Sequence, residues 1–414
     1  MRSKLFSRDF TLVVIGQIIS LFGNATIRFA LPLYLLEQTA SSSLYGRVTA
    51  LAFFPSILLS PFGGMIADRF NKRNIMVVLD FSTAVLLGVC ALLLGHADLV
   101  TLLSITLMLL YGIAGAYQPS VQASIPLLVP SECYMQANSV INTVSSFSAL
   151  LGPALGGVLY GLYGPTPLLW VCSLCFGASA VMEIFIHIPQ THPPKVHGLW
   201  NTIRSDLASS LRFIVRDQPT IGQALAIICA INLFLSSMLS VGLPYIITQR
   251  LDLGEMSSTL YGFTEGALAA GGLIGGVCAG IFAKRLRPQS TGTLLIACSV
   301  CVFPMAFSLC SFVPKLCTYA VLTLFCFGIS FFSTLLTVQI LSYIQAETPE
   351  MLLGKVLSVV FTLSMCAQPI GNALYGSLFE LCRGTESLVF LLSALLSLGT
   401  ALWSRRIFRR LTPQ

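Results

Sequence analysis

Long runs without a charged side chain are the feature that most constrains this chain. Asp, Glu, Lys and Arg are absent from residues 81–95, 99–116, 166–182, 291–313 and 387–403. About 20 mostly apolar residues are enough for a helix to cross the hydrocarbon of a bilayer. Only 9% of the 414 residues are charged and 55% are hydrophobic, whereas a water-soluble domain carries about 25% charged residues. The sequence therefore predicts an integral membrane protein of the all-α class.

Twelve apolar segments are long enough to be transmembrane helices. An even number of spans places both ends of the chain on the same side of the membrane. The predicted helices cover residues 10–36, 45–66, 74–95, 98–124, 135–160, 166–188, 219–249, 258–283, 290–311, 316–343, 354–379 and 386–404.

The distribution of Lys and Arg predicts on which side of the membrane the two ends of the chain lie, because cytoplasmic loops are enriched in these residues. Eighteen of the 23 lie in the N-terminal segment, in alternate loops and in the C-terminal tail. The opposite loops hold only Arg47, Arg250, Lys315 and Arg383, and Arg28 lies within the first span. We therefore expect both termini in the cytoplasm and the protein in the plasma membrane. The net charge of +7 is then explained by the basic residues of the cytoplasmic side. Nothing in the sequence indicates a nucleic-acid partner.

The chain contains an internal duplication. Residues 41–69 align without a gap to residues 257–285, at an offset of 216 positions. The identical pairs are Ser41/Ser257, Ser42/Ser258, Leu44/Leu260, Tyr45/Tyr261, Gly46/Gly262, Gly64/Gly280, Ala67/Ala283 and Arg69/Arg285. Parallel repeats of this kind are typical of transporters whose substrate site lies between the halves, near the middle of the membrane.

The duplication predicts three parts. An N-terminal six-helix bundle covers residues 1–188 and a C-terminal one covers 219–414. The cytoplasmic linker between them, 189–218, begins rich in proline and continues with apolar residues at helical spacing, which predicts an amphipathic helix on the membrane surface. Its apolar positions are Trp200, Ile203, Leu207, Leu211 and Ile214.

A charged loop between the second and third spans carries the first family resemblance. The sequence GGMIADRFNKRNIMVVLD, residues 63–80, resembles the signature loop between helices 2 and 3 of the major facilitator superfamily. The positions concerned are Gly64, Asp68, Arg69, Lys72 and Arg73, with Asp80 extending the charge cluster. The resemblance implies a cytoplasmic latch, in which an acidic group caps a helix and basic groups pair across the two halves. The alternative is a basic loop that only sets topology.

This loop departs from the family pattern at Asn71, where the superfamily usually has glycine. Asparagine also tolerates a left-handed turn, so we expect the loop to keep its shape.

The predicted fifth helix carries the second resemblance. Its sequence SALLGPALGGVLYG resembles the motif of exporting, proton-antiporting branches of the superfamily, at Gly152, Pro153, Gly156 and Gly157. Small residues at this spacing allow helices to approach closely, and the proline offers a pivot. Ordinary close packing, which would serve an importer equally well, is the alternative.

Over most of its length the chain resembles the macrolide-efflux group of drug:proton antiporters. The stretches that carry this are GQIISLFGNATIRFALPLYLLEQTASS (16–42), NIMVVLD (74–80), IPLLVPSE (125–132) and LGKVLSVVFTLSMCAQPIG (353–371). The resemblance implies two pseudo-symmetric six-helix bundles, alternating access, the proton gradient as energy source and no cofactor. The implied substrates are amphipathic small molecules such as macrolides.

Related exporters of siderophores or lysophospholipids fit the same resemblance, and a non-transporting sensor on this fold is a further alternative. An enzyme is not expected, because no nucleophile elbow, phosphate loop or HExxH motif occurs. The sequence does not require an oligomer, so we expect a monomer.

Ionisable residues inside a membrane helix are functional hypotheses, because each costs about 2.5–3.5 kcal/mol on insertion scales. Arg28 and Glu265 each lie about eight residues, or about 12 Å, from the outer end of their helix. Because a nearby guanidinium favours the charged form of a carboxyl group and an apolar cavity disfavours it, a changing distance between them would couple proton uptake and release to transport. A static structural pair is the alternative. Asp80 and Glu183, nearer the cytoplasmic ends, are interpreted as partners of basic loop residues.

Polar residues on the helices that line the pore in this family are the candidates for the substrate cavity; we expect about half to prove interhelical hydrogen-bonding groups. They are Asn24, Tyr111, Gln118, Asn142, Asn232, Gln339, Gln368 and Asn372.

Two cysteine pairs, Cys172/Cys175 and Cys298/Cys301, have the spacing of redox or zinc sites. Each lies inside an apolar segment, which favours packing over metal or redox chemistry. We expect no metal.

Overall fold

The computed structural model describes residues 5–188, 210–251, 253–282, 290–310 and 313–408. The described residues form helices joined by short connections and contain no strand. Twelve helical segments are long and apolar enough to span a membrane, which confirms the predicted number and the all-α class. They are α1 (Arg8–Thr39), α2 (Ser42–Arg69), α3 (Lys72–Leu93), α4 (Leu99–Leu128), α5 (Tyr134–Tyr163), α6 (Pro165–Ile184), the segment Pro219–Arg250, α10 (Ser257–Ile281), α11 (Thr291–Ser308), α12 (Lys315–Glu347), α13 (Glu350–Leu381) and α14 (Glu386–Phe408).

The seventh span, Pro219–Arg250, is not one regular α-helix. It consists of α8 (Pro219–Ile231), a π-helical turn at Asn232–Ser236, α9 (Ser237–Tyr245) and a second π-helical turn at Ile246–Arg250. π-helical turns are rare and frequently mark functional sites, because the wider turn displaces the side chains that follow it.

Several helices begin at polar residues that cap them. The Ser7 side chain accepts a hydrogen bond from the backbone N–H of Phe10, and Asp98 accepts one from Thr101. Asn71 caps α3 by accepting a hydrogen bond from the N–H of Arg73, at φ −63° and ψ 118°. The expectation of a left-handed turn at Asn71 is therefore wrong. Asparagine serves here as a helix cap, a position it favours because its side-chain oxygen satisfies a free backbone N–H.

The chain packs as two compact units whose boundaries interleave along the sequence. The first contains residues 1–40, 47–194 and 247–266, and the second contains 41–46, 195–246 and 267–414. The first residues of α2 therefore pack with the second unit, and the first part of α10 packs with the first unit. The predicted division into bundles 1–188 and 219–414 stays a prediction.

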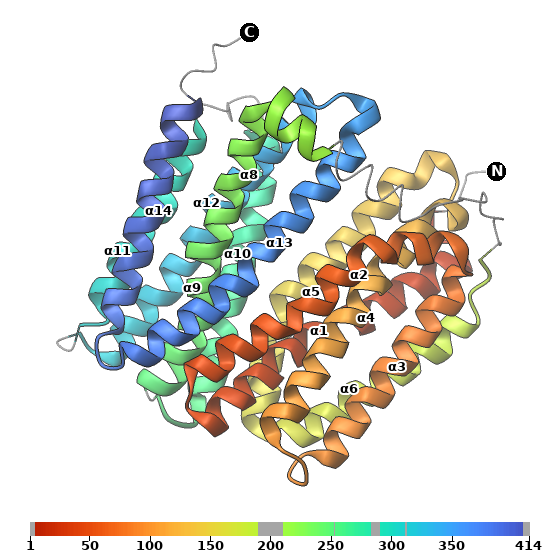
Figure 1. The fold of residues 1–414 in the computed structure, drawn as a ribbon. Helices are drawn as coiled ribbons and strands as arrows, with labels where there is room; N and C mark the ends of the chain where they lie inside the picture. The colour runs from red at the N-terminus through yellow and green to blue at the C-terminus, as the bar shows by residue number, and fades with distance from the viewer. Residues whose placement is uncertain (1–4, 189–209, 252, 283–289, 311–312, 409–414) are drawn as a thin grey trace. The chain divides into compact units, whose positions relative to one another are not determined.

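Each unit has its own helix pairs. In the first, α1 packs against α5 and α6, and α3 packs against α6 and α4; α3 and α6 run side by side in Figure 1. In the second, α11 packs against α14 and α12, while α13 packs against the pieces of the seventh span. Figure 1 shows α11 and α14 adjacent.

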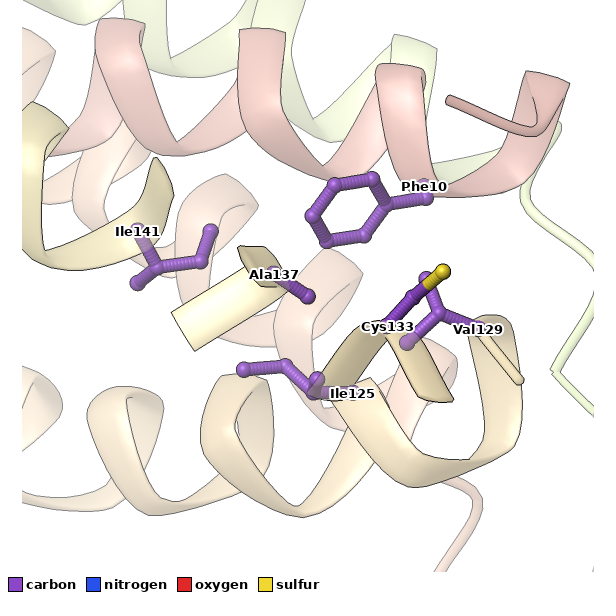
Figure 2. Packing of buried hydrophobic residues seen from close by; sticks show 6 residues of the cluster. All are labelled: Phe10, Ile125, Val129, Cys133, Ala137 and Ile141. Atoms are coloured by element: carbon purple, nitrogen blue, oxygen red, sulfur yellow. The ribbon is translucent and has the colours of Figure 1, made fainter. Parts of the chain in front are cut away.

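Apolar side chains gather at one end of the first unit. Phe10 of α1 faces α4 and α5, as Figure 2 shows, and contacts a cluster whose other members are Ile125, Val129, Cys133, Ala137 and Ile141. This cluster holds the start of α1 against the connection between α4 and α5.

The outward faces of the helices are apolar as well. On α3, Val78, Val85 and Leu92 recur every seven residues and are each 60–64% exposed, whereas Asp80 on the same helix is 2% exposed. A helix with a charged residue inside and valines outside is suited to lipid, because hydrocarbon solvates apolar side chains.

The predicted linker is only partly described. Trp200, Ile203 and Leu207 lie outside the described residues. The part that is described continues as a π-helical turn at Phe213–Asp217, in which Phe213 and Ile214 are buried.

Candidate transport site

The arginine of the first span lies against an aromatic ring. The Arg28 guanidinium carbon is 3.9 Å from the centroid of Tyr111 on α4. Such a cation–π contact contributes about 0.5–2 kcal/mol, more when water is excluded. Asn24, one turn earlier on α1, donates its amide to the Ser20 carbonyl at 3.1 Å. The Arg28 Nε and the Asn24 Oδ1 are buried atoms without a hydrogen-bond partner.

The carboxyl group of the eighth span has a phenol as its partner. Tyr261 Oη donates to Glu265 Oε1 at 3.1 Å within α10. The Tyr261 ring stacks on Phe29 of α1, with centroids 4.9 Å apart. Since Phe29 follows Arg28, both predicted ionisable residues lie beside the same contact between α1 and α10.

Arg28 and Glu265 do not form an ion pair among the contacts described. The guanidinium lies on Tyr111, and the carboxylate accepts from Tyr261. Their coupling therefore stays a prediction about a change during transport.

Two buried carboxyl groups lie deeper in the first unit. Ser20 Oγ donates to Asp80 Oδ2 at 2.6 Å, and Tyr117 Oη donates to Glu183 Oε1 at 2.7 Å. Asp80 is 2% exposed and Glu183 is 0% exposed. Their interpretation as partners of basic loop residues is corrected, because both side chains point into the bundle. Asp80 lies eight residues, or about 12 Å, from the start of α3.

The rest of the predicted latch is only partly visible. For Gly64, Asp68 and Arg69 the structure describes only the helical backbone of α2. Lys72 is 8% exposed, and Arg73 Nε donates to Asn74 Oδ1 at 3.3 Å. A gating role for this loop stays a prediction.

The glycine motif of α5 seats two helices. A Cβ added at Gly152 would lie 2.4 Å from the Cβ of Ala25 on α1, and one added at Gly157 would lie 2.8 Å from the Ser258 carbonyl on α10. A Cβ added at Gly262 would lie 2.7 Å from the Pro153 carbonyl, and Gly156 faces Thr26. The small residues thus allow close approach, as predicted, whereas their link to export stays a prediction.

The duplicated Ser-Ser-x-Leu-Tyr-Gly stretch binds a carboxylate in both copies. In the second unit, Glu380 of α13 accepts hydrogen bonds from the hydroxyls of Ser41 and Ser42 at 3.1 and 3.4 Å. In the first unit, Glu37 of α1 accepts one from Ser258 at 2.6 Å and another from Tyr160. We call these contacts the two carboxylate caps, since each holds the start of a helix, α2 or α10.

The repeated serine pair at the starts of α2 and α10 is a sequence signal for an acceptor, because hydroxyl groups at a buried helix start need hydrogen-bond partners. Glu380 was not selected from the sequence, because its acceptor role depends on which helix packs beside the serines.

The candidate cavity residues differ in their surroundings. Asn232, in the first π-helical turn, donates to the Ser364 carbonyl at 2.9 Å, and Gln339 donates to Ser290 Oγ at 3.1 Å. These two act as hydrogen-bonding groups between segments. Asn372 is 0% exposed and both polar atoms of its side chain lack a partner. The other candidates are Gln118 and Gln368, which are half-buried, and Asn142, which is exposed.

The thirteen cysteines, all among the described residues, form no disulfide. Cys172 and Cys298 are buried, while Cys175 and Cys301 are exposed and half-buried respectively. Among the described residues, no group of three or more His, Cys, Asp or Glu side chains could hold a metal ion.

The comparison with protein families decides the class. A family model described as Major Facilitator Superfamily matches residues 13–372. The chain belongs to the major facilitator superfamily. The resemblance found from the motifs is therefore confirmed, and the protein is a transporter and not an enzyme.

Relatives within the superfamily are exporters by name. Macrolide efflux protein A of Streptococcus pyogenes is 23% identical over 86% of this chain and 85% of its own length. The multidrug efflux pump Tap of Mycobacterium bovis is 22% identical over 89% and 86%. The enterobactin exporter EntS of Escherichia coli is 26% identical over 98% and 94%.

Solved structures of the superfamily share the fold. The nucleoside transporter NupG has a TM-score of 0.77 at 11% identity, covering 97% of this chain and 100% of that one. A D-xylose–proton symporter has a TM-score of 0.70 at 14% identity, covering 95% and 96%. These matches show the shared fold, and the twelve spans together with the family model show a multi-pass membrane transporter.

Proposed function

We propose that this superfamily member exports amphipathic small molecules in exchange for protons. In this proposal the two halves alternate access to a central site, both termini lie in the cytoplasm, and the protein works as a monomer without a cofactor. Export is supported by relatives named as efflux proteins or exporters, at 22–26% identity over most of the chain.

The surroundings of Glu265 are the observation that supports proton exchange. Glu265 lies within a membrane helix with a tyrosine hydroxyl as its described partner, and the ring of that tyrosine stacks on Phe29, the residue after Arg28. A carboxyl group without a bound cation can gain and lose a proton, whereas one locked in an ion pair holds its charge. The position beside Arg28 would make the proton affinity of Glu265 depend on conformation.

Transport in liposomes tests this. The purified protein is reconstituted with a pH-sensitive dye inside, a proton gradient is imposed, and macrolides or cationic dyes are added. We expect substrate-dependent proton movement in the wild type and its loss in Glu265→Gln. The matched control is Glu255→Gln, an exposed carboxyl group before the same helix, which should behave as the wild type. Full proton-coupled transport by Glu265→Gln would contradict the role of Glu265.

A siderophore is the second candidate substrate, since the enterobactin exporter matches 98% of this chain. The same liposomes, given a catecholate siderophore, would show proton movement with that compound and none with macrolides. Proton-independent movement of labelled lysophospholipid would instead indicate a lipid exporter. Binding without movement of any compound would indicate a sensor.

A further inference from the structure

Asp80 and Glu183, which we call the inner acid pair, have no part in the proposed role of Glu265. They come from α3 and α6, which pack together, and α1 and α4 pack around them. Ser179 Oγ lies 3.2 Å from Ser20 Oγ, the hydroxyl that donates to Asp80. Ser20 of α1 therefore lies between Asp80 and Ser179, which is one turn before Glu183 on α6, and the four helices α1, α3, α4 and α6 surround the pair.

The inner acid pair receives few hydrogen bonds for two charges. Ser20 supplies one to Asp80 and Tyr117 supplies one to Glu183. Glu183 Oε2 is buried without a partner. An ionised carboxylate away from water needs several donors or a cation to offset its lost hydration. Two such charges are more than these donors can satisfy.

No basic side chain on the surrounding helices comes near enough to supply that cation. α4 contains no Asp, Glu, Lys or Arg, and α6 contains Glu183 alone. On α3, Lys72 lies eight residues before Asp80, and on α1, Arg28 lies eight residues after Ser20; each separation is about 12 Å along a helix. Arg8 and Asp9 begin α1, and Arg73 follows Lys72 at the start of α3, still farther along. Tyr117 is the remaining titratable group that faces the pair.

One end of the pair is closed by apolar side chains. Four apolar side chains lie about one helical turn from a buried polar residue, on the side of the chain's N-terminus: Val13 from Gln17, Met76 from Asp80, Val121 from Tyr117 and Ile186 from Glu183. They pack with Tyr117 and Ile188 in one buried cluster, each member at most 5% exposed. This layer separates the pair from that end of the bundle.

Polar groups follow one another along one face of α1, from Gln17 on the side of the apolar layer to Asn24 and Arg28 toward the other end. Gln17, three residues before Ser20, is 0% exposed, and neither its Nε2 nor its Oε1 has a partner. Asn24 and Arg28 follow at helical spacing, each with one buried atom unpartnered. Buried polar atoms that lack protein partners are usually bound to water. This face of α1 therefore offers polar atoms that could bind water, in a row leading to the inner acid pair.

We propose that the inner acid pair is a second proton-binding site, which holds one proton between Asp80 and Glu183. Binding forms an O–H bond on one carboxylate oxygen and removes one negative charge; release returns the proton to water on the face of α1 that carries Asn24. The unpartnered Glu183 Oε2 and the amide of Gln17 are the groups that the neutral acid and its water would engage.

Infrared difference spectroscopy of the purified full-length protein tests the proposal without substrate or gradient. The carbonyl stretch of a protonated carboxylic acid is followed from about pH 4 to about pH 10, the interval in which carboxyl groups in ordinary and apolar surroundings titrate. Among the titrating bands we expect one that disappears in Glu183→Gln. In Asp80→Asn its midpoint should fall by about one pH unit or more, because the neighbouring negative charge is removed.

A third variant moves the midpoint the other way. Ser20→Ala removes the hydroxyl that favours ionised Asp80, so the midpoint should rise by several tenths of a pH unit or more. This small change keeps the test available if Glu183→Gln does not fold. Asp98→Asn, at an exposed helix cap of the same unit, is the control and should leave the band unchanged. The proposal would be overturned if Glu183→Gln removed no titrating band, or if the band that it removes depended on Na⁺ at constant pH.

The inference rests on the proposed proton exchange, but the two proposals can be contradicted separately. Loss of substrate-driven proton movement with an intact titration would remove the proposed function and leave the proton site. Intact substrate-driven proton movement without titration at the inner acid pair would remove the second proton site and leave the proposed function.

Discussion

Tyrosines, more than opposite charges, surround the intramembrane charges of this protein. Tyr111 faces Arg28, Tyr117 donates to Glu183, and Tyr261 donates to Glu265. A phenol has an apolar ring and a polar tip, so it can accompany a charge in a membrane without adding another. The consequence is that each charge stays free to change its partner, which an ion pair would prevent.

The ring of Tyr111 should be needed more than its hydroxyl. Tyr111→Phe keeps the cation–π contact with Arg28 and is expected to unfold within about 0.5 kcal/mol of the wild type. Tyr111→Leu removes the contact and should lose about 1–2 kcal/mol, the range for a contact shielded from water. Thermal unfolding of the detergent-purified protein measures both. Equal losses in the two variants would show that the hydroxyl, not the ring, is what matters.

At the scale of elements, the structure depends on how helices begin and cross. The starts of α2 and α10 pack with the unit that does not hold the rest of their half, and each is held by a carboxylate cap. Glycine lets α5 reach α10 at Gly157 and Gly262. The repeated sequence at the two helix starts therefore corresponds to a repeated structure.

The carboxylate caps should each stabilise the folded protein. Glu380→Gln keeps the shape of the side chain but removes the charge that Ser41, Ser42 and the start of α2 face, at a cost of about 1 kcal/mol or more. Glu37→Gln should have a similar effect at α10. Unfolding by urea of each variant in detergent checks this. Glu255→Gln, which removes an exposed carboxylate, serves as a comparison expected to cost less.

Close helix crossing makes Gly157 intolerant of a methyl group. A Cβ there would meet backbone atoms of α10 at 2.8 Å, and backbone cannot rotate away. Gly157→Ala should therefore lose about 1–3 kcal/mol, as overpacked sites do. Gly399→Ala in α14 is the matched control, because nothing lies within 4 Å of its added Cβ. A melting temperature for Gly157→Ala equal to that of Gly399→Ala would contradict the close crossing.

For the whole molecule, the distribution of charge predicts orientation. Eighteen of the 23 Lys and Arg residues lie on the side predicted to be cytoplasmic. A green fluorescent protein fused at the C-terminus should therefore fluoresce, since it matures in the cytoplasm, whereas alkaline phosphatase fused after Gly95 should be active outside. Active phosphatase at the C-terminus would reverse the topology. Replacing the basic residues of the N-terminal segment by Gln should increase the fraction of inverted molecules.

Much of the architecture could be predicted from the sequence because the bilayer imposes it. Lipid cannot hydrogen-bond a free backbone, so a long apolar run has to be a helix, and the twelve spans followed from run lengths alone. The duplication and the glycine motif of α5 were equally visible, since identity and small size are properties of single positions. The motifs were sufficient to recognise the superfamily.

What only the tertiary structure decided is the partner of each polar group. Asp80 and Glu183 were assigned to basic loops because sequence distance placed them near the helix ends; in the folded protein they face Ser20 and Tyr117 instead. Glu380 finds its serines more than 330 residues away in the chain. The physical reason is that a membrane helix is defined locally by its apolarity, whereas a buried hydrogen bond depends on which helix face lies opposite, and that is set by the packing of the whole unit.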